Sequence, residues 1–360
     1  MSATKGTRRH IVVFGGYGVI GTGVVAHLLG RPHWNVTTVG RSSAPGMLFD
    51  GKPAPAHVQV DLLDATTTVS ALVSMSDVTD VVFCAYIERE TMAAAVAPNV
   101  TILGNALEGL RAAGARPGHV VLIGGGKSYG EHLGAYKTPA KERDARFMGP
   151  IFYNDQEDLL WERAGNDGFN WTVLRPDAML GPSIGSPMNM LMGIAAYASV
   201  SKELGIPLRF PGSLGAWSAL HQATDAGVLA EAVEWALTSQ AARGEIFNVT
   251  NGDNFRWQHV WPEIASVFDM DVASPQPMQL AEQMADKGDL WQEMILRHGL
   301  RSISWERLAA WAFVDGWFNM DADMVQSTIK IRQAGFNGCA DTHNALIAAL
   351  KRLRQQKIVP

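Results

Sequence analysis

Five glycines lie within residues 11–25, IVVFGGYGVIGTGVV, a stretch that is otherwise almost entirely apolar. Glycine weakens the interior of a strand or helix, so these glycines require either a tight turn between two buried elements or a backbone left bare for a ligand. Gly15, Gly18 and Gly21 follow the spacing G-x-x-G-x-x-G. Gly15 permits a sharp turn, Gly18 lets the backbone approach a pyrophosphate, and Gly21 lets the following helix pack closely. Because a helix N-terminus offers free N–H groups to phosphates, we predict a dinucleotide-binding turn.

Short runs of β-branched residues alternate with helical segments through the first half of the chain. Near-continuous apolar strands that alternate with helices are typical of a parallel sheet covered on both faces. We therefore predict an α/β protein with a Rossmann-type, doubly wound parallel sheet. The expected strands are 10–15, 35–40, 57–62, 78–85, 119–125, 170–176 and a closing strand 245–250.

The texture of the sequence changes after residue 176, first to segments rich in Met, Gly and Pro and then to Trp-rich helical segments. We interpret these as a smaller, mainly helical lobe for substrate, and favour core packing over ligand contact for its tryptophans. The predicted division assigns residues 1–178 and 215–250 to the NADP-binding domain. Residues 179–214 and 251–360 then form the substrate-binding lobe.

Composition excludes several classes of function. The formal net charge of −5 provides no basic surface for nucleic acid. The longest apolar stretch, 190–200, is too short to span a bilayer. Two cysteines cannot build a disulfide framework, and the histidines lack metal-ligand spacing, so we expect no metal site. With no signal sequence visible, we expect a cytoplasmic protein whose partner is a small molecule. A homodimer is compatible with this sequence.

The expected second strand indicates which dinucleotide binds. Proteins that bind NAD usually end this strand with Asp or Glu, which holds the ribose 2′-hydroxyl. Here NVTTVGRSS has no acid; Arg41 stands in that place and Ser42 follows. A guanidinium can pair with the additional phosphate of NADP, so we favour NADPH/NADP over a solvated loop arginine. Asp61 and Leu62, at the end of the third strand, are candidates for adenine contact, although Asp61 fits a surface loop equally well.

A dehydrogenase of this architecture needs a proton donor beside the nicotinamide. No tyrosine in this sequence has a lysine four residues later. Tyr153 lies where the catalytic tyrosine is expected, with Glu157 in the position of the lysine. A different lysine, Lys127 in GGGKSYG, lies just beyond the fifth expected strand, at the edge where ligands bind. Glu157 and Asp158 adjoin each other on a helix, so their side chains diverge and we reject them as an acid/base pair.

Taken together, these stretches resemble the progesterone 5β-reductase and iridoid synthase family, an atypical branch of the extended short-chain dehydrogenases/reductases. A tyrosine in FYxxQED combined with a displaced lysine is more specific than any glycine pattern. The matching pieces occur in order along nearly the whole chain: GGYGVIG, GGGKSYG, MGPIFYNDQED, WTVLRP with SPMNM, LRFPGSLGAW, IFNVTNGDNFRWQHVW and KIVP.

The resemblance implies that Tyr153 and Lys127 form the catalytic pair. In this family hydride passes to the β-carbon of an enone, and the tyrosine hydroxyl stabilises the developing enolate. Lys127 would hold the cofactor ribose and lower the pKa of Tyr153. A helix-packing role for Tyr153 and a solvated loop position for Lys127 are the structural alternatives. Further cofactor contacts implied are Tyr17, Val19, Ile20, Pro176, Met179, Ser186 and Met188. The implied substrate pocket comprises Tyr86, Asn154, Met188 and Phe313.

Two departures from the family pattern affect this pocket. The family carries two consecutive tyrosines where this chain has Tyr153 and Asn154. The family tryptophan after the fourth strand is missing, and Tyr86 or Ile87 lies near its place. Both changes lie in the pocket and leave the hydride apparatus intact. Because the pocket selects the substrate, specificity for a steroid or a monoterpene dialdehyde is unsupported.

The leading hypothesis is an NADPH-dependent reductase that adds hydride 1,4 to α,β-unsaturated carbonyl compounds. One alternative is 1,2-reduction of aldehydes or ketones by the same apparatus. A second is a non-catalytic NADP-binding sensor or scaffold. An epimerase or dehydratase is disfavoured, because those enzymes hold NAD tightly and no acid ends the second expected strand.

Overall fold

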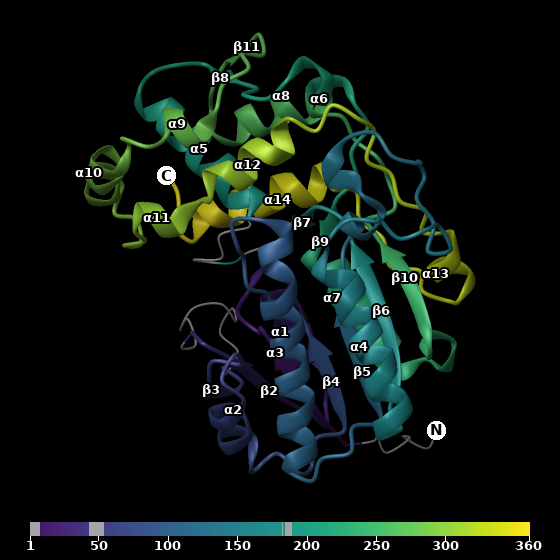
Figure 1. The fold of residues 1–360 in the computed structure, drawn as a ribbon. Helices are drawn as coiled ribbons and strands as arrows, with labels where there is room; N and C mark the ends of the chain where they lie inside the picture. Colours follow the sequence, from purple (N-terminus) through teal and green to yellow (C-terminus); the bar gives the residue numbers. More distant parts are fainter. Residues whose placement is uncertain (1–7, 43–53, 182, 184–188) are drawn as a thin grey trace, which may run out of the picture.

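A seven-stranded parallel sheet forms one half of the molecule (Figure 1). The computed structural model describes residues 8–42, 54–181, 183 and 189–360. The strand order is β10-β6-β5-β4-β1-β2-β3, and every neighbouring pair runs parallel. This order confirms the doubly wound fold, and each expected strand takes its place in the sheet. The strands are β1 (Arg9–Phe14), β2 (Trp34–Gly40), β3 (Ala56–Gln59), β4 (Asp80–Phe83), β5 (His119–Ile123), β6 (Asn170–Pro176) and β10 (Glu245–Val249).

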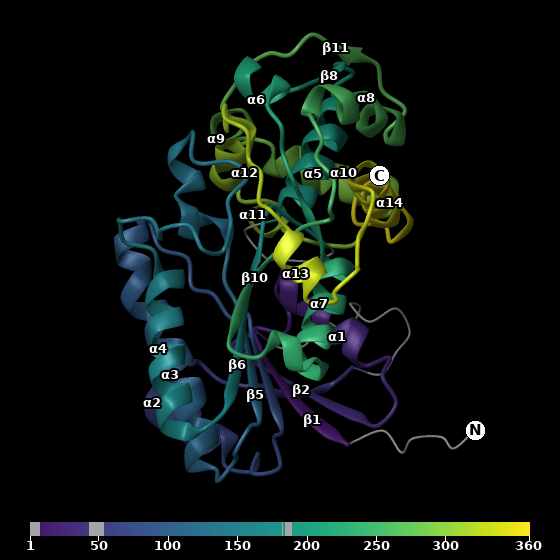
Figure 2. The same ribbon diagram turned by 90° about the vertical axis from the view of Figure 1, so that its right-hand side faces the viewer.

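Helices cover both faces of this sheet (Figure 2). Along β1, Ile11 and Val13 pack on one face while Val12 and Phe14 pack on the other, and all four are fully buried. Side chains alternate between the faces of a strand, so burial of both faces explains why these strands are apolar at nearly every position. One face is covered by α1 (Val19–Leu28), α7 (Ala226–Thr238) and α13 (Ile329–Gln333). The other is covered by α2 (Ala65–Leu72), α3 (Met92–Ala112) and α4 (Phe152–Asp167).

A mainly helical lobe lies beyond the carboxyl ends of the strands (Figure 1). Its short strands form two parallel pairs, β7 (Met179–Leu180) with β9 (Thr224–Asp225) and β8 (Leu208–Arg209) with β11 (Val272–Ala273). Across the described ranges, no helix combines the length and apolar character needed to cross a membrane. The lobe helices are α5 (Met190–Glu203), α6 (Leu214–Ser218), α8 (Trp257–Val267), α9 (Leu280–Gln283), α10 (Gly288–His298), α11 (Trp305–Leu308), α12 (Trp311–Phe318) and α14 (Thr342–Gln355).

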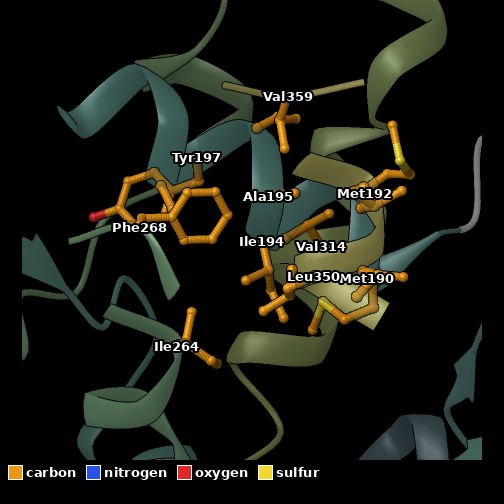
Figure 3. Packing of buried hydrophobic residues seen from close by; sticks show 14 of the residues in the cluster. Met190, Met192, Ile194, Ala195, Tyr197, Ile264, Phe268, Val314, Leu350 and Val359 are labelled. Atoms are coloured by element: carbon orange, nitrogen blue, oxygen red, sulfur yellow. The ribbon is translucent and has the colours of Figure 1, made fainter. Parts of the chain in front are cut away.

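The helix α5 is the centre of the lobe. All its residues from Met190 to Ser201 are buried, as expected of a helix surrounded by protein on every side. Figure 3 shows Ile194 and Ala195 of α5 among side chains from α8, α12 and α14. The tryptophans for which core packing is confirmed are Trp257, Trp261, Trp291 and Trp305.

The two cores exchange segments across the division predicted from the sequence. Ala216 and Ala223 pack in the core of the lobe, whereas Ile331 and Phe336 pack with the sheet and α7. The exact boundary between the two parts stays a prediction. The chain passes between the two cores more than once, so the two halves are joined at several places.

Candidate active site

A cleft of about 1370 Å³ lies between the lobe and the edge of the sheet where the parallel strands end. Open α/β sheets bind ligands at this edge, because the connections that follow neighbouring strands diverge there. The sheet side of the cleft consists of the segments that follow β1 to β6. The predicted residues that line it are Gly15, Tyr17, Gly18, Val19, Ile20, Arg41, Ser42, Asp61, Leu62, Tyr86, Lys127, Tyr153, Pro176 and Met179; Phe313 lines it from the lobe.

The glycine turn between β1 and α1 has the geometry that a dinucleotide needs. Gly15 has φ +79°, a left-handed conformation that favours glycine. A Cβ on Gly21 would lie 2.2 Å from the carbonyl oxygen of Gly15, so a side chain there would force the helix away. A Cβ on Gly18 would lie 3.6 Å from the Gly15 carbonyl oxygen, an ordinary contact, and α1 begins after Gly18 without a side-chain cap. The cradle and the free N–H groups fit a pyrophosphate.

Residues that could recognise the adenosine half lie along the ends of β2 and β3. Arg41 is exposed on the cleft, and its carbonyl oxygen accepts a hydrogen bond of 2.8 Å from the Gln59 amide. The carboxylate of Asp61 accepts a hydrogen bond of 3.0 Å from the backbone of Leu63. The hydroxyl of Tyr17 accepts a hydrogen bond of 2.9 Å from Thr38. Arg41 therefore lies on the cleft directly after β2, and its contact with a 2′-phosphate stays a prediction.

Tyr153 and Lys127 lie on the same wall of the cleft. Tyr153 is in the first turn of α4, and its ring packs directly on Gly125: a Cβ on Gly125 would lie 2.9 Å from the ring and 3.0 Å from the hydroxyl oxygen. Gly125 comes directly before η1 (Gly126–Tyr129), which carries Lys127. The tight contact of the tyrosine ring explains why the middle residue of GGG, Gly125, has no side chain. In the described part of the chain, Lys127 forms no ion pair.

Burial governs the titration of this pair. Burial raises the pKa of Tyr153, and the neighbouring Tyr86 and Glu131 raise it further. The net shift of the Tyr153 pKa is upward, and the lowering effect expected of Lys127 stays a prediction. Burial lowers the pKa of Lys127, while the charges of Glu131 and Glu88 oppose that shift. Tyr153 consequently remains a neutral phenol at physiological pH, which suits a hydrogen-bond donor.

Glu157, which stands where a lysine is usual, belongs to a buried ion pair. Its carboxylate is fully buried and accepts hydrogen bonds from Arg175 at 2.7–3.0 Å and from Arg146 at 2.8 Å. Asp158 points elsewhere, to the exposed side of Arg146. Glu157 therefore ties α4 to β6 and keeps Tyr153 in register with the ends of the strands.

Some predicted residues are not brought to the cleft. Asn154 does not line it; its amide contacts the carbonyl oxygen of Phe147 at 3.5 Å. A helix turns by about 100° per residue, so Asn154 points away when Tyr153 faces the cleft. Gly21 acts behind the cleft, by close packing. The predicted contacts Ser186 and Met188 lie outside the described residues.

Two acidic residues on the same side of the cleft as Tyr153 and Lys127 were not predicted from the sequence. Glu131, in η2 (Glu131–Leu133), and Asp177, directly after β6, both line the cleft. Burial raises the pKa of Glu131 well above its ordinary value, and the charge of Asp177 adds to this. Burial likewise raises the pKa of Asp177 to about 7. The signal in the sequence was an acid placed directly after each of two strand-end motifs, GGGKSYG and WTVLRP.

The lobe side of the cleft was also largely missed. It carries both aromatic and basic side chains, and a sequence gives no direct indication of which residues of short helices face a neighbouring domain. Its lining residues are Gln292, Arg301, Ser302, Ile303, Ser304, Arg307, Phe313 and Trp317. Within the described ranges, no cluster of three or more His, Cys, Asp or Glu side chains could hold a metal ion.

A doubly wound sheet, a glycine cradle and a tyrosine–lysine wall at the carboxyl edge define an oxidoreductase of the short-chain dehydrogenase/reductase superfamily. More narrowly, the chain belongs to the PRISE-like Rossmann-fold domain family, whose model matches residues 56–360. This confirms the resemblance identified from the sequence.

Curated relatives and solved structures agree with this assignment. The chain is 32% identical to an (S)-8-oxocitronellyl enol synthase of Camptotheca acuminata, over 97% of this chain and 93% of the relative. It is 30% identical to a 3-oxo-Δ(4,5)-steroid 5β-reductase of Arabidopsis thaliana, over 91% of this chain and 86% of the relative. A Thermus thermophilus UDP-glucose 4-epimerase in complex with NAD shares the fold, with a TM-score of 0.65, 18% identity, and coverage of 96% of this chain and 99% of the epimerase.

Proposed function

We propose that this protein is an NADPH-dependent reductase that adds hydride to the β-carbon of α,β-unsaturated carbonyl compounds. The observation that carries the proposal is the position of Tyr153 and Lys127 on one wall of a cleft that also holds the glycine turn. The relatives named as a steroid 5β-reductase and as enol synthases support the same class of substrate.

NADPH fits the residues of the cleft. Gly15 and Gly18 would receive the pyrophosphate, Arg41 the 2′-phosphate, and Lys127 the nicotinamide ribose. When bound, the reduced nicotinamide supplies the hydride. The absence of an acid at the end of β2 favours NADPH over NADH.

Tyr153 performs the stabilising step. As hydride reaches the β-carbon, negative charge develops on the carbonyl oxygen of the substrate. The neutral phenol donates a hydrogen bond to that oxygen, and the Lys127 ammonium adds a favourable field in a cleft partly closed to water. A preorganised donor stabilises the enolate more than the starting ketone, so it accelerates the reaction.

The apolar part of the cleft defines where the substrate would lie. Tyr86, Phe313 and Trp317 line it, and Tyr86 also packs on Phe152, with ring centroids 5.2 Å apart. Rings of this kind fit an apolar enone whose only strongly polar atom is its carbonyl oxygen.

The test compares the wild type with Tyr153→Phe, using NADPH and small enones such as 2-cyclohexen-1-one. We expect a saturated ketone as the product and a fall in kcat of about 10²–10⁴-fold in the variant, because the donor to the oxyanion is lost. The dissociation constant for NADPH serves as the control and should remain unchanged.

Other products would identify the alternatives. An allylic alcohol would indicate 1,2-reduction of the carbonyl. NADPH binding without oxidation across a broad panel of enones, aldehydes and ketones would reject the enzyme and favour an NADP-binding sensor. A cytoplasmic location and a homodimer stay predictions, which cell fractionation and sedimentation would test.

A further inference from the structure

On the sheet side of the cleft, Glu131 and Asp177 each bury a carboxyl group that lacks a complete set of partners. Each residue is only 5% exposed. Among the described residues, neither Oε2 of Glu131 nor Oδ2 of Asp177 has a hydrogen-bond partner. An unsatisfied buried carboxyl oxygen costs free energy, so a structure that retains two of them together calls for a function.

The backbone makes room for this pair. A Cβ on Gly126 would lie 2.1 Å from Oε2 of Glu131 and 2.4 Å from the amide nitrogen of Gln326. Any residue larger than glycine would therefore displace the Glu131 carboxyl. The other oxygen of Asp177, Oδ1, accepts a hydrogen bond of 2.7 Å from the backbone of Ala178. The Glu131 carboxyl thus lies directly beside Gly126, the residue that precedes Lys127, and Asp177 directly follows the end of β6.

The charged and titratable groups around the pair come from each neighbouring segment. Lys127 of η1 is the cation that acts on Glu131, and Asp177 is the neighbouring acid. Glu131 and Asp177 both raise the pKa of Tyr136, and Glu131 also raises that of Tyr153. Further out, Glu88 and His132 interact with Lys127. Glu131 therefore acts electrostatically on both Lys127 and Tyr153.

We propose that Glu131 and Asp177 are positioning residues that store a proton behind Lys127 and return it to Tyr153 after each reduction. The inference rests on the proposed function. Glu131 holds the proton, and Asp177 keeps it there, because a second carboxylate beside it would be strongly repelled. In this proposal the proton crosses from Glu131 to Lys127 through hydrogen-bonded water.

Each reduction transfers one hydride and one proton to the enone. The enone accepts hydride at its β-carbon, the C=C electron pair moves toward oxygen, and NADPH becomes NADP⁺. The O–H bond of Tyr153 breaks as its proton goes to the enolate oxygen, giving an enol that tautomerises to the saturated carbonyl. An N–H bond of Lys127 then breaks to restore the phenol, and the O–H bond of Glu131 breaks to restore the ammonium. A solvent proton finally returns to Glu131.

The test measures the pH profile of steady-state kcat for the wild type, Glu131→Gln and Asp177→Asn, between about pH 5 and pH 10. The wild type should lose kcat on the alkaline side as Glu131 loses its proton. Glu131→Gln should lower kcat by about 10-fold or more and abolish that limb. Asp177→Asn should move the limb to lower pH, because removing the neighbouring charge lowers the pKa of Glu131.

Single-turnover kinetics separate this role from a structural one. Tyr153 begins each first turnover protonated, so the first hydride transfer should keep its wild-type rate in Glu131→Gln while later turnovers are slow. The dissociation constant for NADPH should be unchanged. The matched control is Glu142→Gln, a half-buried acid that also has a raised pKa and whose oxygen accepts a hydrogen bond from the backbone of Asn248. That variant should retain the wild-type pH profile.

The outcomes are distinct. If the wild type oxidises no NADPH with any enone, the proposed function fails. If the wild type turns over and Glu131→Gln keeps the same kcat and alkaline limb, only the proton store is rejected. Should Glu131→Gln fail to fold, Asp177→Asn and the wild-type solvent isotope effect decide: an unshifted limb with equal kcat in H₂O and D₂O overturns the inference.

Discussion

The two walls of the cleft are built by different means. The sheet wall is formed by backbone at the ends of parallel strands, with glycines at points where a Cβ would collide with a neighbour, as at Gly15 and Gly125. The lobe wall is formed by side chains of short helices and loops, such as Phe313 and Trp317. The hydrogen-bonded sheet fixes the positions of backbone atoms at the strand ends. The side chains of the lobe wall, in contrast, can change by single substitutions without moving the backbone. We infer that the sheet wall determines the chemistry and the lobe wall determines the substrate.

The largest expected effect tests the rigidity of the sheet wall through Glu157. Glu157→Gln leaves the buried Arg175 without its counter-charge, so the free energy of unfolding should fall by about 3–5 kcal/mol in a denaturant titration. Asp158→Asn is the control: this neighbour is exposed, pairs only with Arg146 among the described residues, and should change the free energy of unfolding by about 1 kcal/mol or less. Equal losses in the two variants would contradict the special role of the buried pair.

A smaller effect is expected at Gly21, which packs behind the sheet wall at a point where a side chain does not fit. Gly21→Ala places a methyl group against the Gly15 carbonyl, so stability should fall by about 1–3 kcal/mol and NADPH should bind more weakly. Gly165→Ala is the matched control on α4, where a Cβ meets nothing within 4 Å. Because alanine has a higher helix propensity than glycine, Gly165→Ala should raise the free energy of unfolding by up to about 1 kcal/mol. Thermal unfolding and fluorescence titration with NADPH measure both effects, and unchanged NADPH affinity in Gly21→Ala would count against the glycine cradle.

The smallest effect should arise on the lobe wall. Phe313→Leu should change kcat/KM for a bulky enone by about fivefold, corresponding to about 1 kcal/mol, with NADPH affinity unaltered. Phe268→Leu is the control, since Phe268 is buried in the core of the lobe and does not line the cleft. It should lower stability and leave the ranking of substrates unchanged. A change in NADPH affinity in Phe313→Leu would contradict the inference that the lobe wall determines only the substrate.

Most of the sheet half could be predicted because its signals are local. The β-branched runs and the turn at Gly15, Gly18 and Gly21 are readable within a few residues, and each corresponds to a strand or turn of the structure. Arg41 likewise follows its strand directly. Asn154 was misplaced, since a family pattern gives a position along a helix but not the side that faces the cleft.

The buried acids and the lobe wall were beyond the reach of local signals. Glu131 and Asp177 are 46 positions apart in the chain (177 − 131), and only the adjacency of β5 and β6 brings them together. Glu157 and Arg175 are closer in the chain, but their pairing depends on how α4 packs against β6. Their burial decides their pKa values, and burial is a property of the complete fold.

The apolar circumference of α5 has a consequence for biosynthesis. Its cover includes α14 and, beyond it, Ile358 and Val359, which are almost wholly buried. About 140 residues separate the end of α5 at Glu203 from the start of α14 at Thr342, so a ribosome needs on the order of 10 s to deliver the covering helix. During that interval the apolar surface of α5 is exposed on the nascent chain, because the residues that cover it have not been synthesised. This segment is therefore a binding site for chaperones during synthesis.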